Sequence, residues 1–220
     1  AQLSRGLGDV YKRQGDELCE NLNVRKISFT GSTNVGKILM SKTAGTVKRV
    51  SMELGGHAPF IVFEDADLDE AVIGAMANKY RNSGQVCVSA NRIYVHENIY
   101  DEFSNRLAEK SSQLKVADGR TEGSQIGPLI TPQAFKKVEE HVEDAVEKGA
   151  KILTGGTNDN SGMQFYKPTV LTDINNNMKI YYEETFGPVA PIIKFKDENE
   201  VIEMANDTKY GLAGYFYSRD

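Results

Sequence analysis

The residue best suited to covalent chemistry in this chain is Cys87. It closes the stretch RNSGQVC, residues 81–87, six positions after Arg81. A nearby guanidinium favours the thiolate over the thiol, and the thiolate is the form in which a cysteine attacks carbon. Small residues around the cysteine leave space beside the sulfur; they are Ser83, Gly84, Ser89 and Ala90. The segment predicts a nucleophile, with an inert buried cysteine as the alternative.

A carboxylate precedes the cysteine in the stretch SMELGG, residues 51–56. Glu53 ends an apolar run there and two glycines follow, so its side chain could lie at the end of a strand beside a ligand. A solvated glutamate at a turn is the alternative. Further along, residues 183–188 read EETFGP, which by itself predicts only a turn that enters a buried strand.

A glycine turn lies upstream in residues 29–38, FTGSTNVGKI. Such a turn between a strand and a helix brings the backbone close to a phosphate or a nicotinamide ring, with helix N–H groups facing the ligand. Residues 31–37 also approach the P-loop pattern, which requires Ser or Thr after the Lys to bind magnesium. That next position is Ile38, which has no oxygen, so a P-loop nucleotide-binding protein is the weaker alternative. A glycine that simply starts a helix is the other one.

In this order, the four segments resemble those of the aldehyde dehydrogenase superfamily. The family has a Gly-Ser turn, a Glu-Leu-Gly-Gly base motif, a Gly-Gln-x-Cys nucleophile and a Glu-x-Phe-Gly-Pro motif. The resemblance covers residues 15–220, including the GPL turn at 127–129. Within the superfamily the sequence is most similar to succinate-semialdehyde dehydrogenases, through residues 24–31, 58–63 and 211–217. A non-catalytic relative is disfavoured because Cys87 and Glu53 are both present.

The resemblance implies a mechanism for oxidising an aldehyde, with succinic semialdehyde as the leading substrate and NAD or NADP as cofactor. Cys87 would form a thiohemiacetal and then a thioester, and Glu53 would activate the water that hydrolyses it. Arg81 would bind the distal carboxylate of the substrate. Some relatives have a second cysteine at the position of Ser89, so that redox partner is absent here. The cofactor would contact Gly31, Ser32, Val35, Leu54, Glu184 and Phe186.

The resemblance also implies a domain organisation. Residues 1–14 look unrelated to the family and are expected to be disordered. Residues 15–53 would be the remnant of a Rossmann-like NAD(P)-binding domain, and residues 54–220 the catalytic domain. A second oxyanion donor (an Asn) and a Lys for the adenosine ribose would lie upstream, and an oligomerisation strand after residue 220. The full-length enzyme is therefore expected to be a homo-oligomer.

The elements that must position these residues follow from hydrophobic periodicity. Short apolar runs alternate with amphipathic stretches, which predicts an α/β fold with a largely parallel sheet. Thr131 and Pro132 have the residue types of a helix start, and Gly149 those of a helix end. The expected strands cover 24–29, 59–63, 92–95, 151–154, 189–195 and 213–217, and the expected helices begin near 33, 68, 99, 132 and 201.

Composition narrows the functional class. The net charge is −5 and no basic stripe is present, which argues against nucleic acid as a partner. No apolar run is long enough to span a bilayer. The three histidines and two cysteines lie at no metal-ligand spacing, so no metal site is expected, and two cysteines make no disulfide framework. Composition thus leaves a soluble protein of a reducing compartment as the default, and the family resemblance adds the expectation of a cytoplasmic enzyme that acts on a small-molecule aldehyde.

Overall fold

The computed structural model describes residues 7–220, which form two compact units. The first extends to Gly55 and the second covers Gly56–Asp220. The division falls two residues after the border expected between residues 53 and 54. Residues 1–6 of the expected disordered lead lie outside the described residues.

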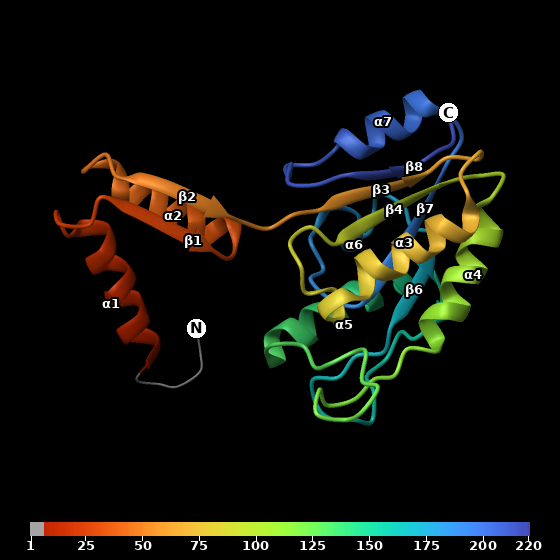
Figure 1. Ribbon diagram of the computed structural model, residues 1–220, viewed down its shortest axis with the longest axis horizontal. Helices are drawn as coiled ribbons and strands as arrows, with labels where there is room; N and C mark the ends of the chain where they lie inside the picture. The colour runs from red at the N-terminus through yellow and green to blue at the C-terminus, as the bar shows by residue number, and fades with distance from the viewer. Residues whose placement is uncertain (1–6) are drawn as a thin grey trace. The chain divides into compact units, whose positions relative to one another are not determined.

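The first unit is a βαβ motif preceded by a helix (Figure 1). Strand β1 (Lys26–Thr30) pairs in parallel with β2 (Arg49–Glu53), and α2 (Thr33–Ala44) connects them. The Nζ atom of Lys48 donates to the carbonyls of Asn21 and Val24 at 2.6 and 2.7 Å, which secures the turn that enters β1. A parallel strand pair with a helical crossover is the repeating unit of dinucleotide-binding sheets.

Helix α1 spans Leu7–Glu20 and so begins inside the segment expected to be disordered. Residues 7–14 differ from that expectation because nothing in them forbids a helix. The stretch contains no proline, and its one glycine, Gly8, lowers helix propensity by only about 1 kcal/mol relative to alanine.

The second unit is built on a six-stranded sheet in the order β5-β6-β7-β4-β3-β8. All neighbouring pairs are parallel except β5 with β6. The largely parallel sheet expected from the sequence is therefore confirmed. The strands are β3 (Ala58–Val62), β4 (Ala90–His96), β5 (Lys151–Thr154), β6 (Thr169–Thr172), β7 (Val189–Phe195) and β8 (Tyr215–Tyr217).

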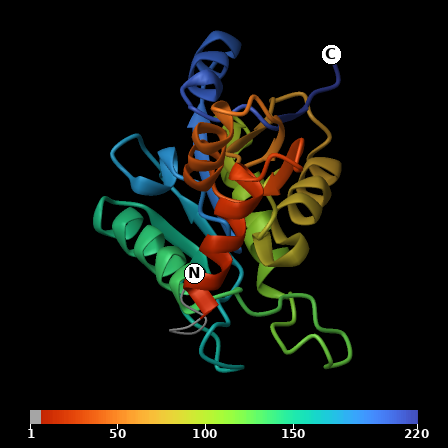
Figure 2. The ribbon, with the colours of Figure 1, turned by 90° about the vertical axis from the view of Figure 1, so that its left-hand side faces the viewer.

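Helices cover both faces of this sheet, and side chains alternate between them. Figures 1 and 2 show α3 and α4 on one face and α5 on the other. Along β4, Ile93 and Val95 pack toward α3 and α4, whereas Tyr94 packs toward α5. Burial on both faces explains why these strands are nearly continuous apolar runs. The helices are α3 (Leu68–Tyr80), α4 (Tyr100–Ser112), α5 (Pro132–Glu147), α6 (Lys179–Tyr182) and α7 (Glu198–Asn206).

Three helices of the second unit begin at residues whose side chains cap them. Asp67 caps α3, Thr131 caps α5 ahead of Pro132, and Asp197 caps α7, each by accepting a backbone N–H three residues ahead. After α5, Gly149 adopts φ 103°, a left-handed conformation suited to glycine at a helix end. The end of α5 at this glycine sets where β5 begins, two residues later.

Because β3, β4, β7 and β8 are parallel, the segments that precede them meet at one edge of the sheet. Those segments are Gly56 and His57, residues 85–89, residues 183–188 and residues 211–214. Three of the four motifs that the sequence singles out therefore reach the amino ends of adjacent strands.

Candidate active site

Cys87 lies on a tightly folded loop between α3 and β4. The loop begins with a short 3₁₀ segment, η1 (Arg81–Gly84), in which Asn82, Ser83 and Gly84 have positive φ. Left-handed backbone at two non-glycine residues carries a conformational cost, and such positions occur frequently at functional sites. Ser83 stabilises the turn, because its Oγ donates to Gly127 O at 3.1 Å and accepts from Gly127 N–H at 2.9 Å.

Two glycines bring the motif backbones into direct contact. A Cβ added to Gly56 would lie 2.1 Å from the carbonyl oxygen of Cys87, and one added to Gly84 would lie 2.1 Å from that of Gly187. A side chain at either position would therefore collide with backbone. The end of the Glu-Leu-Gly-Gly motif packs on Cys87, and the Cys87 loop packs on the Glu-x-Phe-Gly-Pro turn.

Glu184, in the Glu-x-Phe-Gly-Pro motif, links that turn to Gly56 through its side chain. Its Oε1 accepts the Gly56 N–H at 3.0 Å, and Lys137 donates to its backbone carbonyl. Burial raises the pKa of the Glu184 carboxyl, while the Gly56 N–H and the charges of Lys137 and Lys79 oppose the rise. Its second oxygen accepts no hydrogen bond from the described residues and remains available to a ligand hydroxyl.

His141 holds the same turn from α5. Its Nδ1 lies 3.1 Å from the hydroxyl of buried Thr185, and its Nε2 lies 3.4 Å from Glu183. Burial lowers the pKa of His141, and the Lys137 charge lowers it further. Phe186 follows with φ 54°, so this turn, like the Cys87 loop, contains a non-glycine residue in the left-handed region.

The Cys87 thiol is half-buried and free. The backbone N–H of Cys87 has no hydrogen-bond partner in residues 7–220, which leaves it open to a ligand oxygen. Beyond the cysteine, the Tyr215 hydroxyl donates to Val88 O at 2.9 Å. Ser89 is buried, and its Oγ has no partner among the described residues.

Glu53 belongs to the first unit and is adjacent to the glycine turn. It ends β2 opposite Thr30, and its carbonyl accepts the Gly31 N–H at 3.0 Å. The Glu53 side chain is exposed and makes no hydrogen bond or ion pair in the described chain. The base motif and the glycine turn thus share one backbone contact, as neighbouring parallel strand ends do.

The amino end of α2 fits a cofactor. Ser32 caps the helix by accepting the Val35 N–H at 3.3 Å, which leaves the N–H groups of Thr33 and Asn34 without partners in residues 7–220. Free N–H groups at a helix start favour a polar or anionic ligand group. Val35 is exposed, and Leu54 packs over Gly36, where a Cβ would lie 2.6 Å from Leu54 Cδ2. Donors beside apolar side chains suit a nicotinamide dinucleotide.

Arg81 is exposed and lies on a groove between α3 and α4. It makes no ion pair with any described residue. Cys87 does not line this groove, so the two sequence-predicted residues share a loop and not a cavity. The groove is lined by Ile73, Met76, Ala77, Tyr80, Arg81, Lys110, Leu114, Gln125 and Ile126.

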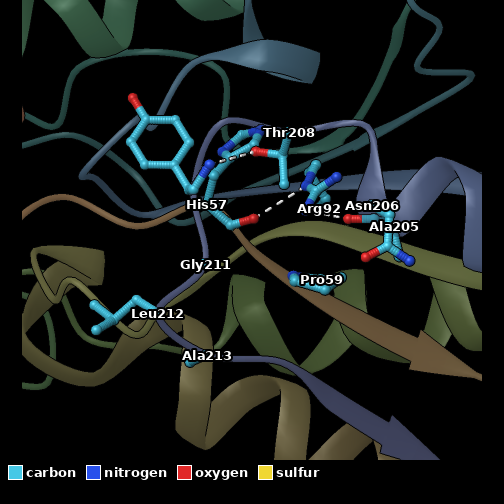
Figure 3. A pocket seen from close by; sticks show the side chains of 10 residues that line it. His57, Pro59, Arg92, Ala205, Asn206, Thr208, Gly211, Leu212 and Ala213 are labelled. Atoms are coloured by element: carbon cyan, nitrogen blue, oxygen red, sulfur yellow. Dashed lines mark hydrogen bonds between the residues drawn. The ribbon is translucent and has the colours of Figure 1, made fainter.

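A polar cavity of about 240 Å³ lies beside His57, at the amino edge of the sheet (Figure 3). His57 Nε2 lies 2.8 Å from Tyr181 O, and burial lowers the pKa of His57 to about 3. Buried Arg92 donates to His57 O at 3.0 Å and to the Met204 and Ala205 carbonyls at the end of α7. The cavity is lined by His57, Pro59, Arg92, Ala205, Asn206, Thr208, Tyr210, Gly211, Leu212 and Ala213.

Several residues that support the loop are absent from the sequence prediction. Asn78 and Lys79 both bond to Ala90, the first residue of β4. Lys79 had a signal in the sequence, because it continues the apolar stripe of its helix, where lysine is out of place. Tyr215 and His57 had none, since their contacts join segments far apart in the chain.

Residues 7–220 hold no helix long and apolar enough to cross a membrane. In the same residues, no three His, Cys, Asp or Glu side chains lie together as metal ligands would.

The chain is similar to characterised enzymes over nearly all its length. It is 55% identical over 206 residues to the NADP(+) succinate-semialdehyde dehydrogenase of Escherichia coli. The aligned region covers 94% of this chain and 43% of that relative. It is 57% identical over 197 residues to 3-sulfolactaldehyde dehydrogenase of Pseudomonas putida, with 90% and 40% covered. The chain therefore spans about two fifths of the length of these relatives.

Comparison with solved structures and with family models leads to the same group. The crystal structure of succinate-semialdehyde dehydrogenase from Burkholderia pseudomallei superposes with a TM-score of 0.94 at 55% identity, covering 95% of this chain and 43% of that one. The model of the aldehyde dehydrogenase family matches residues 8–220, so the match extends into the lead that looked unrelated. The chain belongs to the aldehyde dehydrogenase family.

Proposed function

We propose that this chain carries the nucleophile and the general base of an enzyme that oxidises an aldehyde to a carboxylate with NAD or NADP. The observation that carries the proposal is the meeting of three motifs at the amino ends of β3, β4 and β7. Gly56 packs on Cys87, Gly84 packs on Gly187, and the Gly56 N–H bonds to Glu184. The contacts surround a half-buried free thiol, the group that a covalent mechanism requires.

In the first half of the proposed reaction, the Cys87 thiolate adds to the aldehyde carbon and forms a thiohemiacetal. The oxygen of that adduct develops negative charge, which donors fixed in advance stabilise. The unpartnered N–H of Cys87 is one such donor. A bound nicotinamide dinucleotide supplies the acceptor for the hydride that leaves the adduct, and a thioester on Cys87 remains.

In the second half, Glu53 takes a proton from water, and the water adds to the thioester carbon. The carbon–sulfur bond then breaks, which releases the carboxylate and restores the thiolate. Support for this role comes from the exposed carboxylate of Glu53, which no hydrogen bond occupies in the described chain. Gly31, Ser32, Val35 and Leu54 would hold the cofactor in the first unit, and Glu184 with Phe186 would contact it from the second.

We further propose that the substrate carries an anionic group at the end opposite the aldehyde, with succinic semialdehyde as the leading candidate. Two relatives are named for substrates of this kind, one a carboxylate and the other a sulfonate. Arg81 is a free guanidinium on the nucleophile loop and can bind such a group through two parallel hydrogen bonds. By the same family resemblance, the full-length enzyme would be a cytoplasmic homo-oligomer.

Two substitutions in the full-length enzyme test the assignment. Cys87→Ala should abolish aldehyde oxidation, since no thioester can form. Glu53→Gln should retain the first reduction of NAD(P) and block turnover, so that stopped-flow absorbance shows a burst with no steady state. A burst reduced in size would mean that Glu53 also activates Cys87. Turnover at the wild-type rate in either variant would contradict the proposal.

A further inference from the structure

Lys79 occupies a position where lysine is costly. Its side chain is fully buried in the last turn of α3, and its Nζ donates to Ala90 O at 2.9 Å and to Asn91 Oδ1 at 3.3 Å. Both hydrogen-bond partners are uncharged, and the Glu184 carboxylate acts on the amine only through its charge, without an ion pair in the described chain. A buried amine without a directly paired carboxylate pays a desolvation cost that an apolar residue of similar volume avoids. Stability alone therefore does not account for lysine at this position.

The preceding residue binds the same strand residue from the other side. Asn78 Oδ1 accepts the Ala90 N–H at 2.6 Å, while Lys79 takes the Ala90 carbonyl. Two consecutive residues of α3 thus hold both polar backbone atoms of Ala90. A backbone residue held on both sides cannot rotate or slide without losing a buried hydrogen bond.

The short segment between Ala90 and Cys87, three residues earlier, is also held by hydrogen bonds. The Ser89 N–H bonds to Val86 O at 3.0 Å, and the Tyr215 hydroxyl bonds to Val88 O at 2.9 Å. On the other side, Gly56 packs against the carbonyl of Cys87. A displacement at Ala90 would therefore reach the Cys87 backbone, whose N–H is the proposed oxyanion donor.

We infer that Asn78 and Lys79 are positioning residues for the nucleophile: by holding Ala90, they fix the backbone that presents the Sγ and N–H of Cys87. The inference rests on the proposed function, in which Cys87 forms the thiohemiacetal. Their role lies in the alignment of the N–H donor with the adduct oxygen, because a displacement of about 1 Å at a reacting group can lower the rate by about 100-fold.

A matched pair of variants tests this in the full-length enzyme. Asn78→Asp keeps an oxygen to accept the Ala90 N–H, whereas Asn78→Leu has similar volume and none. We expect Asn78→Leu to lower kcat by roughly 30- to 100-fold with the KM for aldehyde within about threefold of wild type. Asn78→Asp should stay within about threefold in kcat. Lys79→Met should behave as Asn78→Leu does, and the surface substitution Lys136→Met should behave as wild type.

Alkylation of Cys87 separates positioning from loss of structure. Iodoacetamide needs an accessible thiolate and no oxyanion donor, so its rate at Cys87, followed by mass spectrometry, should stay within about threefold of wild type in Asn78→Leu. The inference is overturned if Asn78→Leu keeps wild-type kcat, if Asn78→Asp is as slow as Asn78→Leu, or if alkylation falls in parallel with kcat. Wild-type activity of Cys87→Ala would instead overturn the proposed function itself.

Discussion

The carboxylate of Glu184 and the backbone of Cys87 meet at one residue, Gly56. The Gly56 N–H bonds to the carboxylate, and its missing Cβ leaves room for the Cys87 carbonyl. In the proposed enzyme, Glu184 would bind a cofactor hydroxyl through its second oxygen. The same side chain holds Gly56, on which the Cys87 carbonyl packs. At the residue scale, the proposed cofactor contact of Glu184 and the backbone geometry of Cys87 both depend on Gly56.

The role of Arg81 can be decided by the choice of substrate. We expect Arg81→Ala in the full-length enzyme to raise the KM for succinic semialdehyde, because a charge-assisted pair is lost. The lost transition-state stabilisation should be about 2–4 kcal/mol, which lowers kcat/KM by roughly 30- to 1,000-fold. Steady-state kinetics with an uncharged aldehyde of similar length provide the control and should change little.

Arg81→Lys refines the comparison, because an ammonium cannot reproduce the two parallel hydrogen bonds of a guanidinium. Equal losses with both aldehydes would remove the substrate assignment. They would indicate that Arg81 acts on the thiolate of Cys87 instead.

The burial of Lys79 predicts the direction in which the stability of the protein changes with pH. Desolvation lowers the pKa of Lys79 from 10.5 to about 7. Between these values the unfolded chain binds a proton that the native chain has lost, so this group makes stability rise with pH. Relative to Lys79→Met, the wild type should gain stability from about pH 7 to pH 10, approaching a few kcal/mol.

Urea unfolding of the two proteins at successive pH values measures this difference. The other titrating groups are common to both proteins and cancel in the subtraction. Parallel stability curves for the two proteins would show that Lys79 does not titrate in this window.

At the scale of elements, the site depends on where helices stop and strands begin. The loop from α3 to β4 passes through three consecutive left-handed residues, and the third, Gly84, faces the carbonyl of Gly187. The contact fixes the distance between the strand that follows Cys87 and the strand that follows Phe186. Adjacent strands β4 and β7 then hold both turns in register.

Gly84→Ala should therefore destabilise the protein. Its φ of 73° is unfavourable for alanine, and the new Cβ would collide with backbone that cannot move aside. We expect the free energy of unfolding to fall by about 2–4 kcal/mol, measured by urea denaturation. Gly119→Ala, in an open turn with nothing within 4 Å of the new Cβ, is the control. Equal stability of the two variants would show that the Gly84–Gly187 contact carries no constraint.

The elements that the sequence predicts well are those with a strong local pattern. The strands at Lys151–Thr154 and Val189–Phe195 match the expected bounds. Strand β6 is missing from the prediction, because its terminal residues Thr169 and Thr172 are polar and yet buried. Neighbouring loops supply hydrogen bonds that make this possible, as for the Thr169 hydroxyl, which donates to Lys167 O and accepts from Gly156 N–H. The candidate motifs can be recognised in the sequence. The contacts of Gly56 with Cys87 and of Gly84 with Gly187 cannot, because they join segments that only the tertiary structure brings together.

At the scale of the whole molecule, the residues of the proposed site are divided between two units. Glu53 and the glycine turn belong to the first unit, and Cys87, Glu184 and Phe186 to the second. Within residues 7–55, the first unit has two strands and exposes several apolar side chains. They are Leu18, Leu22, Val35, Ile38, Met40 and Val47.

We expect the 220-residue chain alone to bind NAD(P) weakly and to reduce it at a negligible rate. A dinucleotide fold normally spans two βαβαβ halves, and the first unit contains one βαβ motif. Isothermal titration calorimetry with NAD and NADP, together with absorbance assays of reduction, measures both expectations. The full-length enzyme serves as the reference. Affinity and turnover near those of that reference would contradict the prediction.

Contacts between the motifs made by backbone alone have a consequence for how this protein can change. Gly56 and Gly84 each receive a carbonyl oxygen from another motif, so these two contacts do not depend on any side-chain rotamer. In a saturation mutagenesis experiment, these two positions should tolerate no other residue. Arg81 is exposed on the same loop and lies outside these contacts, so other residues there should leave the fold intact and change only which aldehyde is oxidised. Selection for a new aldehyde could then act on the loop surface while the thiol keeps its place.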